Sequence, residues 1–190
     1  MKYLKIIVLV LLTQVACKAD KSKTDAKTAQ SDYAPNDANT PPSKLSFPAG
    51  EFDPRITQAT IDSMLKYFDE RAISGFQFDP RGFMYLIKKE GTGKNPDIGQ
   101  EVTVNYQGRL TDDKEFDSTY KTSKPLSYKV GKMIPGFDAA VMLLKPGGKG
   151  LFVLPPFLAY ENKSVKGPDG KELIPPGSKL VFEIELMSIK

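Results

Sequence analysis

The sequence VTVNYQGRLTDDKEFDS at residues 102–118 decides the fold of this chain. Apolar and polar residues alternate from Val102 to Tyr106, which predicts a strand with one buried face. A glycine then interrupts the alternation, the polar run TDDK predicts a turn, and EFDS returns as a second strand. We therefore predict a β-hairpin that brings Tyr106, Phe116 and Asp117 close together.

The rest of the chain from residue 82 onward continues this strand pattern around one helix. The period changes between Phe137 and Leu144, which predicts a short helix that the KPGG run at 145–148 ends. The expected fold is an α+β half-barrel, in which an antiparallel sheet wraps on that helix. The strands predicted from alternation cover residues 83–89, 101–110, 115–118, 126–130, 150–155 and 179–189.

A second helix is predicted before the sheet, over residues 57–73. Its apolar residues Ile61, Met64, Leu65 and Phe68 recur at helical spacing, so the helix is amphipathic. The apolar stripe needs a partner. That partner is either the surface of the chain's own domain or the same helix of a second copy, which would make a homodimer.

The N-terminus has the features of an export signal. A charged start, MKYLK, precedes a short apolar run that ends at Leu12, so residues 1–16 are expected to be a signal peptide. The run is too short to span a bilayer. The sequence QVAC at 14–17 resembles a bacterial lipobox, which implies lipidation of Cys17; the alternative is an ordinary signal with cleavage near Ala16 and a free thiol. Residues 17–50 are polar and predict a lipidated disordered tether.

Composition excludes several classes of function. The chain has no histidine, which removes the usual general base and the imidazole ligand of zinc. It has 27 basic and 23 acidic residues and no dense basic block, so a nucleic-acid partner has no electrostatic support. No metal and no cofactor are expected. Any chemistry must proceed without an imidazole.

The motifs around the hairpin identify a family. VNYQGRL followed by EFDS resembles the signature of the FK506-binding class of peptidyl-prolyl isomerases. The resemblance covers residues 82–190. Together with the export signal and the lipobox it indicates an exported bacterial lipoprotein form of the family, in which the predicted helical segment at 51–81 lies between the tether and the isomerase domain. Four further segments agree in order with the family: KPLSYKVG at 124–131, MIPGF at 133–137, LPPFLAY at 154–160 and IPPGSKLVFEIEL at 174–186.

The resemblance also implies a pocket for a proline ring. Phe137 would be its floor, and Tyr106 and Phe116 its walls. Ile134 would offer its backbone N–H, and Tyr160 its hydroxyl, to substrate carbonyls. The remaining implied members are Asp117 at the rim and Phe182, Leu126, Met133 and Ile174 around the ring.

The implied function is cis-trans isomerisation of proline bonds in proteins that fold outside the cytoplasm. A non-catalytic proline-segment-binding chaperone or envelope assembly factor is the alternative, because Phe137 stands where the family usually has tryptophan and Leu126 replaces a common aromatic wall. The expected partners are proline-containing polypeptides and a membrane, reached through the lipid anchor. Lys18 after the lipidated cysteine favours the outer membrane, with the domain in the periplasm or at the cell surface.

Overall fold

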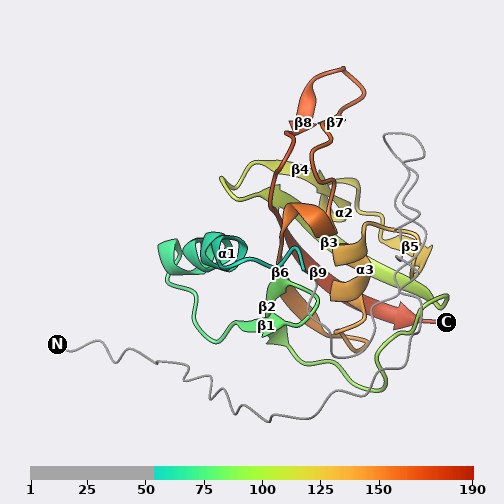
Figure 1. Ribbon diagram of the computed structural model, residues 1–190. Helices are drawn as coiled ribbons and strands as arrows, with labels where there is room; N and C mark the ends of the chain where they lie inside the picture. The colour runs from blue at the N-terminus through green and yellow to red at the C-terminus, as the bar shows by residue number, and fades with distance from the viewer. Residues whose placement is uncertain (1–53) are drawn as a thin grey trace, which may run out of the picture. The chain divides into compact units, whose positions relative to one another are not determined.

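The computed structural model describes residues 54–190 (Figure 1), and the predictions for residues 1–16, 17–50 and Cys17 lie outside that range. The alternating segments form one seven-stranded antiparallel sheet, as the sequence predicts. Strand β5 (Leu126–Lys129) pairs with β3 beside the main path. The main path runs through β1 (Gln77–Asp79), β2 (Phe83–Lys89), β6 (Lys149–Leu154), β9 (Leu180–Ile189), β3 (Glu101–Leu110) and β4 (Glu115–Ser118).

The helix α3 (Pro135–Val141) covers one face of this sheet. It begins two residues before the predicted start, because Pro135 occupies the first helical position, where its missing N–H costs nothing. Residues 142–144 are not helical, so the predicted end at Leu144 is wrong. The strand predictions for 126–130 and 179–189 are each wrong by one residue at one end, and the prediction for 150–155 is shifted by one residue at both ends. The predictions for 83–89, 101–110 and 115–118 match the structure.

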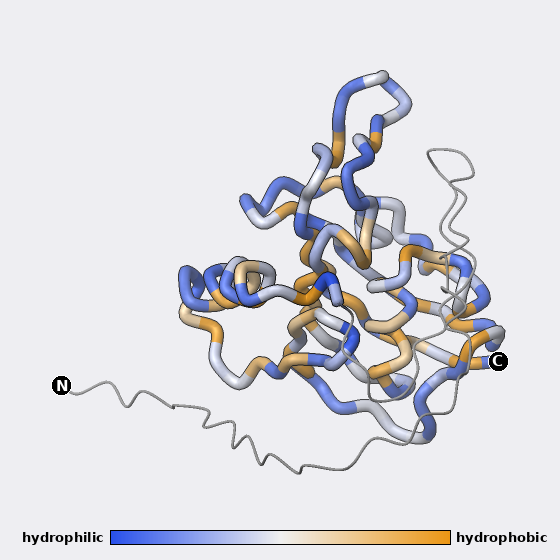
Figure 2. Tube along the Cα trace, viewed as in Figure 1, coloured by the Kyte–Doolittle hydropathy of each residue, from blue (hydrophilic) through white to orange (hydrophobic). Residues whose placement is uncertain are grey.

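The main core lies between α3 and the sheet. In β9 the alternate residues Leu180, Phe182, Ile184 and Leu186 are all buried on this side, as predicted. Figure 2 shows hydrophobic residues along the central strands, whereas the loop between β7 and β8 is largely hydrophilic. Alternation therefore identified the core face of the sheet.

The predicted N-terminal helix is α1 (Gln58–Glu70), and it covers the opposite face of the sheet. The predicted end at residue 73 is wrong by three residues, because the backbone leaves the helical conformation at Arg71 and is left-handed at Ala72, with φ of 50°. The α1 residues Met64, Tyr67 and Phe68 are buried against the other set of alternating strand residues, which includes Leu151 and Val181. The partner of the apolar stripe is thus the domain's own sheet. This is the intramolecular alternative of the two that the sequence left open.

Several short elements were not predicted. The 161–173 loop carries a small hairpin of its own, whose Gly167-to-Gly170 turn is the one that its GPDG sequence indicates. Within the described residues, no helix is both long and apolar enough to cross a membrane. The unpredicted elements are β1, α2 (Thr119–Thr122), η1 (Pro156–Leu158), β7 (Val165–Lys166) and β8 (Glu172–Ile174).

Candidate functional site

Four aromatic rings from four separate elements, β3, β4, α3 and β9, meet between α3 and the sheet. The ring of Phe137 packs edge-on against Tyr106 and against Phe182, with centroid distances of 5.3 and 5.2 Å. Phe116 packs edge-on against Phe182 at 5.6 Å. Edge-to-face contacts at this spacing are favourable. We call Tyr106, Phe116, Phe137 and Phe182 the aromatic cluster.

A glycine makes the outer part of this cluster possible. A Cβ atom at Gly108 would lie 2.7 Å from the ring atoms Cε2 and Cζ of Phe116 and 2.9 Å from Cε1 of Phe182. The absence of a side chain there allows both rings to lie directly on strand β3. The glycine that interrupts the alternation therefore has a packing role.

Asp117 is tied to the aromatic cluster through hydrogen bonds at both carboxylate oxygens. The hydroxyl of Tyr106 donates to Oδ2, and the backbone N–H of Ser118 donates to Oδ1 at 2.8 Å. Burial, assisted by Asp117, raises the pKa of Tyr106 well above its ordinary value. The phenol thus stays protonated as a donor, and the carboxylate is held in one orientation.

The remaining predicted residues lie in or against the same hydrophobic core, with different exposure. Ile134 and Ile174 are buried in it, whereas Leu126, Met133 and Tyr160 are only partly buried. Burial, with a further contribution from Asp117, raises the pKa of Tyr160. The structure therefore brings all the predicted residues into one region, but Phe137, Ile174 and Phe182 have very little accessible surface.

Comparison with known proteins identifies the family of this chain. A match to the family of FKBP-type peptidyl-prolyl cis-trans isomerases covers residues 92–187, just over half of the chain. The chain belongs to this family.

Two bacterial proteins are among the relatives of this FKBP-type chain. The FKBP-type peptidyl-prolyl cis-trans isomerase FkpA of Escherichia coli (strain K12) is 40% identical over 116 residues, which are 61% of this chain and 41% of the relative. Outer membrane protein MIP of Legionella longbeachae is 40% identical over 111 residues, 58% of this chain and 46% of the relative. The crystal structure of FkpA from Escherichia coli superposes with a TM-score of 0.59 at 35% identity, covering 70% of this chain and 60% of that chain. This structural match confirms the FKBP-like fold. The chain spans less than half the length of the two curated relatives.

A threonine beside the aromatic cluster was missed by sequence reasoning. Tyr106 sits where β3 passes from its pairing with β5 to its pairing with β4, and its N–H donates to Oγ1 of Thr119 at 2.9 Å. The same hydroxyl donates to the Tyr106 carbonyl at 3.2 Å. Thr119 thus substitutes for a strand neighbour and fixes the backbone of Tyr106. No local signal in the sequence indicates this, because the two residues meet only after the hairpin folds.

A buried polar pair behind Phe137 was also missed. Asp138 is completely buried, and its Oδ2 accepts a hydrogen bond from the Met133 N–H at 3.0 Å. Burial raises the pKa of Asp138, although the N–H groups of Gly131 and Met133 and the Tyr128 hydroxyl oppose the shift. Among residues 54–190, the Tyr128 hydroxyl and Asp138 Oδ1 complete no hydrogen bond, although the hydroxyl lies close enough to Asp138 to act on the pKa of that carboxyl. In the sequence, Asp138 is only the second residue of the helix predicted over 137–144, and its burial has no local signal.

This carboxyl organises the loop that leads into α3. The loop of residues 131–134 ends at Ile134, whose carbonyl accepts from Phe137 N–H at 3.0 Å and Asp138 N–H at 3.2 Å. Within the described chain the Ile134 N–H has no hydrogen-bond partner. The site therefore offers apolar surface, a backbone donor and two phenols. Between residues 54 and 190, no three carboxylate or thiol side chains lie close enough to hold a metal ion.

Proposed function

We propose that this chain catalyses cis-trans isomerisation of X-Pro peptide bonds in unfolded or partly folded polypeptides. The observation that carries the proposal is the aromatic cluster with the Tyr106–Asp117 hydrogen bond at its edge. Membership of the FKBP-type family supports it. The name of the FKBP-type peptidyl-prolyl cis-trans isomerase FkpA describes the same activity.

The reaction suits a site without general bases. Rotation about the amide has a barrier of about 18–20 kcal/mol, because resonance gives the C–N bond partial double-bond character. The twisted amide has lost that resonance and its charge separation, so an apolar environment favours it over the planar ground state. No proton needs to be transferred, which agrees with a chain that has no histidine.

In this proposal, residues take the roles that the family resemblance implies. Phe137 lies beneath the proline ring, and Tyr106 and Phe116 flank it. The Ile134 N–H and the Tyr160 hydroxyl donate to substrate carbonyls; the unpaired Ile134 N–H supports this role. Asp117 makes a polar contact at the rim, and the residues around the ring are Phe182, Leu126, Met133 and Ile174.

We further propose that the protein acts in the bacterial cell envelope. The signal peptide at 1–16, the lipidated Cys17 and the tether at 17–50 would hold residues 51–190 at a membrane, with the outer membrane favoured. The name of outer membrane protein MIP supports a membrane location. Mature protein from its native host should partition into the detergent phase, and mass spectrometry should find a lipid on Cys17. Partition into water together with an unmodified Cys17 would contradict the lipid anchor.

A second candidate is a binding protein that holds proline segments without accelerating isomerisation. The feature that favours it is Phe137, a smaller ring than the tryptophan usual at this position of the family. The two candidates make different predictions for the rate of isomerisation and the same prediction for peptide binding.

The deciding experiment follows the cis-to-trans relaxation of a short proline peptide in the presence of the whole chain in mild detergent. Wild type should accelerate relaxation, and Phe116→Ala should reduce the acceleration at least about tenfold by removing apolar surface that contacts the twisted amide. Tyr120→Ala is the matched control, because Tyr120 is a 46% exposed ring outside the aromatic cluster. Peptide binding without acceleration by folded wild type selects the second candidate.

A further inference from the structure

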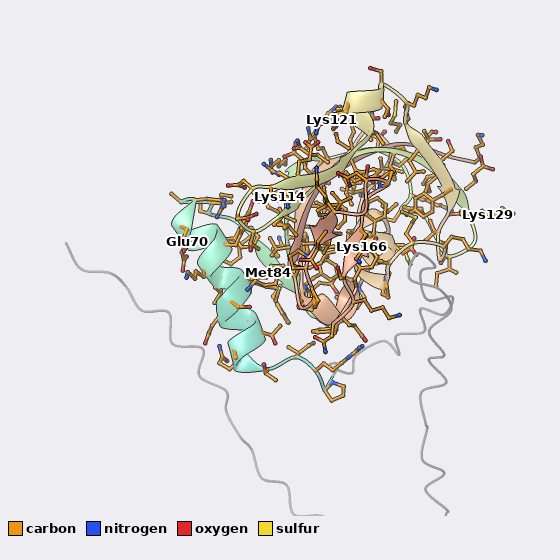
Figure 3. All side chains as sticks on the ribbon, turned by 90° about the horizontal axis from the view of Figure 1, so that it is seen from above. Glu70, Met84, Lys114, Lys121, Lys129 and Lys166 are labelled. Atoms are coloured by element: carbon orange, nitrogen blue, oxygen red, sulfur yellow. The ribbon has the colours of Figure 1, made fainter. Side chains whose placement is uncertain are left out.

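The segment that contains α1 contacts two other parts of the chain. One is the turn that leads to Phe116 and Asp117, and the other is the stretch that carries Tyr160. At the C-terminal end of the segment, Nη2 of Arg71 donates to the Thr111 carbonyl at 2.9 Å and to Oδ2 of Asp113 at 2.8 Å. These acceptors belong to the turn between β3 and β4. Figure 3 labels Glu70 at this end of α1 and Lys114 in the turn, which lie on the same side of the molecule.

Arg71 is itself held in place. Its guanidinium lies over the Tyr67 ring, with Cζ 4.1 Å from the centroid, and its side chain is 25% exposed. The Tyr67 ring is buried between α1 and the sheet. An exposed ion pair alone contributes little. Here the stacked guanidinium also binds the neutral carbonyl of Thr111, so the contact restrains the backbone of the turn as well as the side chain of Asp113.

The turn that Arg71 contacts leads directly into β4. This strand has four residues and pairs within the sheet only with β3, among the strands described. Its register shifts between Gly108 and Arg109, where a bulge interrupts the ladder. Few backbone hydrogen bonds therefore fix Phe116 and Asp117, and an additional contact at the turn has a large share in positioning them.

The N-terminal end of the segment contacts the other side of the site. Nη1 of Arg55 lies 3.3 Å from Oε1 of Glu161, and its guanidinium lies 4.7 Å from the Phe157 ring centroid. Next to it, Ile56 and Phe157 converge on Gly82, where a Cβ would be 2.8 Å from each. Glu161 directly follows Tyr160 in the chain. The segment thus contacts the stretch that presents the Tyr160 hydroxyl.

Between these two contacts α1 is a rigid connection. Its 13 residues span about 20 Å at the usual rise of an α-helix. Met64, Tyr67 and Phe68 anchor it to the sheet face opposite α3. The two ends of the segment are therefore held at a fixed separation on the same sheet that carries the aromatic cluster.

We propose that residues 55–71 form a brace that sets the distance between β4, with Phe116 and Asp117, and the segment of Tyr160. Arg71 is the positioning residue at the β4 end. The catalytic part of this inference rests on the proposed isomerase function, whereas the structural part does not.

The test compares Arg71→Ala with Lys66→Ala in the full-length protein. Lys66 lies on the same helix and forms an exposed ion pair with Glu70, so its replacement removes a charge without touching the turn. Arg71→Ala should lower kcat/KM for a proline peptide about fivefold through a change in alignment rather than in folding. Amide hydrogen exchange of residues 110–118 should accelerate by a similar factor, while exchange in β6 and β9 stays at the wild-type rate.

Asp113→Asn is the second variant, since it leaves the fold intact at a 53% exposed position. Asn tolerates the left-handed conformation that Asp113 adopts, with φ of 68°. We expect about a twofold decrease in kcat/KM for Asp113→Asn alone. Adding this change to Arg71→Ala should give no further decrease, because both variants break the same contact between Arg71 and Asp113.

Three results for Arg71→Ala would overturn the brace. The first is amide exchange at residues 110–118 no faster than in Lys66→Ala, and the second is exchange that rises uniformly over the whole sheet. The third is faster exchange at residues 110–118 with an unchanged kcat/KM. An inactive wild type would instead contradict the proposed function. In that case hydrogen exchange alone decides, since local acceleration at residues 110–118 supports the brace and its absence contradicts it.

Discussion

The hydroxyl of Tyr106 donates a hydrogen bond to the carboxylate of Asp117 across the β3–β4 hairpin. The bond joins a buried ring of the aromatic cluster to an exposed rim residue. It explains how a short edge strand keeps its polar side chain oriented. It also makes the phenol a donor over a wide pH range, since burial and Asp117 raise its pKa.

Tyr106→Phe removes this donor and keeps the ring. We expect kcat/KM for a proline peptide to fall about fivefold, because Asp117 is no longer oriented, and stability to fall by about 1–2 kcal/mol. The raised pKa of Tyr106 further predicts a wild-type rate that does not change between pH 7 and 10, as the phenol stays protonated there. A pH–rate profile tests this. An alkaline loss below pH 10 that Tyr106→Phe abolishes would contradict it.

Gly108→Ala places a methyl group where the Phe116 ring lies. With only 2.7 Å between that Cβ and two ring atoms, the ring must move outward, and we expect an activity loss of about tenfold with a stability loss of about 1–3 kcal/mol. Thr103→Ala is the control on the same strand, where a surface hydroxyl pair with Ser127 is lost instead. Equal activities of the two variants would show that the position of Phe116 does not matter.

Asp138→Asn tests the buried carboxyl behind Phe137. Because burial raises the pKa of Asp138, the folded state binds this proton more tightly than the unfolded state. That contribution to stability is complete below the unfolded pKa of about 3.9 and is lost as pH rises through the folded pKa.

The Asn variant keeps an acceptor for Met133 N–H and carries no charge. At pH 7 we expect it to be more stable than wild type by about 1 kcal/mol in urea unfolding, with the difference closing near pH 3. Asp138→Ala loses the acceptor and should be less stable by about 2 kcal/mol. If the difference in unfolding free energy between the Asn variant and wild type instead widens on acidification, the pKa of Asp138 is lowered by folding rather than raised.

Phe68→Ala tests where the apolar stripe of α1 is buried. Phe68 is completely buried and stacks on Phe76 at 4.5 Å, so truncation should cost about 3–5 kcal/mol. Since this burial is intramolecular, the denaturation midpoints of wild type and variant should not depend on protein concentration. A midpoint that rises with concentration would support the homodimer through α1 instead.

The strands were predictable because alternation reports directly which face of a strand is buried. The segments 83–89, 101–110 and 115–118 agree with the structure for this reason. The start of α3 was misplaced because Pro135 looks like a break in sequence but fits the first turn of a helix. The 165–174 hairpin was missed because two- and three-residue strands are too short to show a period.

The sequence by itself determined the fold family, the core face of each long strand and the group of residues that gather around Phe137. Ordered motifs and side-chain periodicity carry that information locally. The tertiary structure alone decided which partners meet: Thr119 on the backbone of Tyr106, Tyr128 beside Asp138, and Arg71 on the β3–β4 turn. Periodicity states that a side chain is buried, but the identity of its neighbour depends on how distant segments pack.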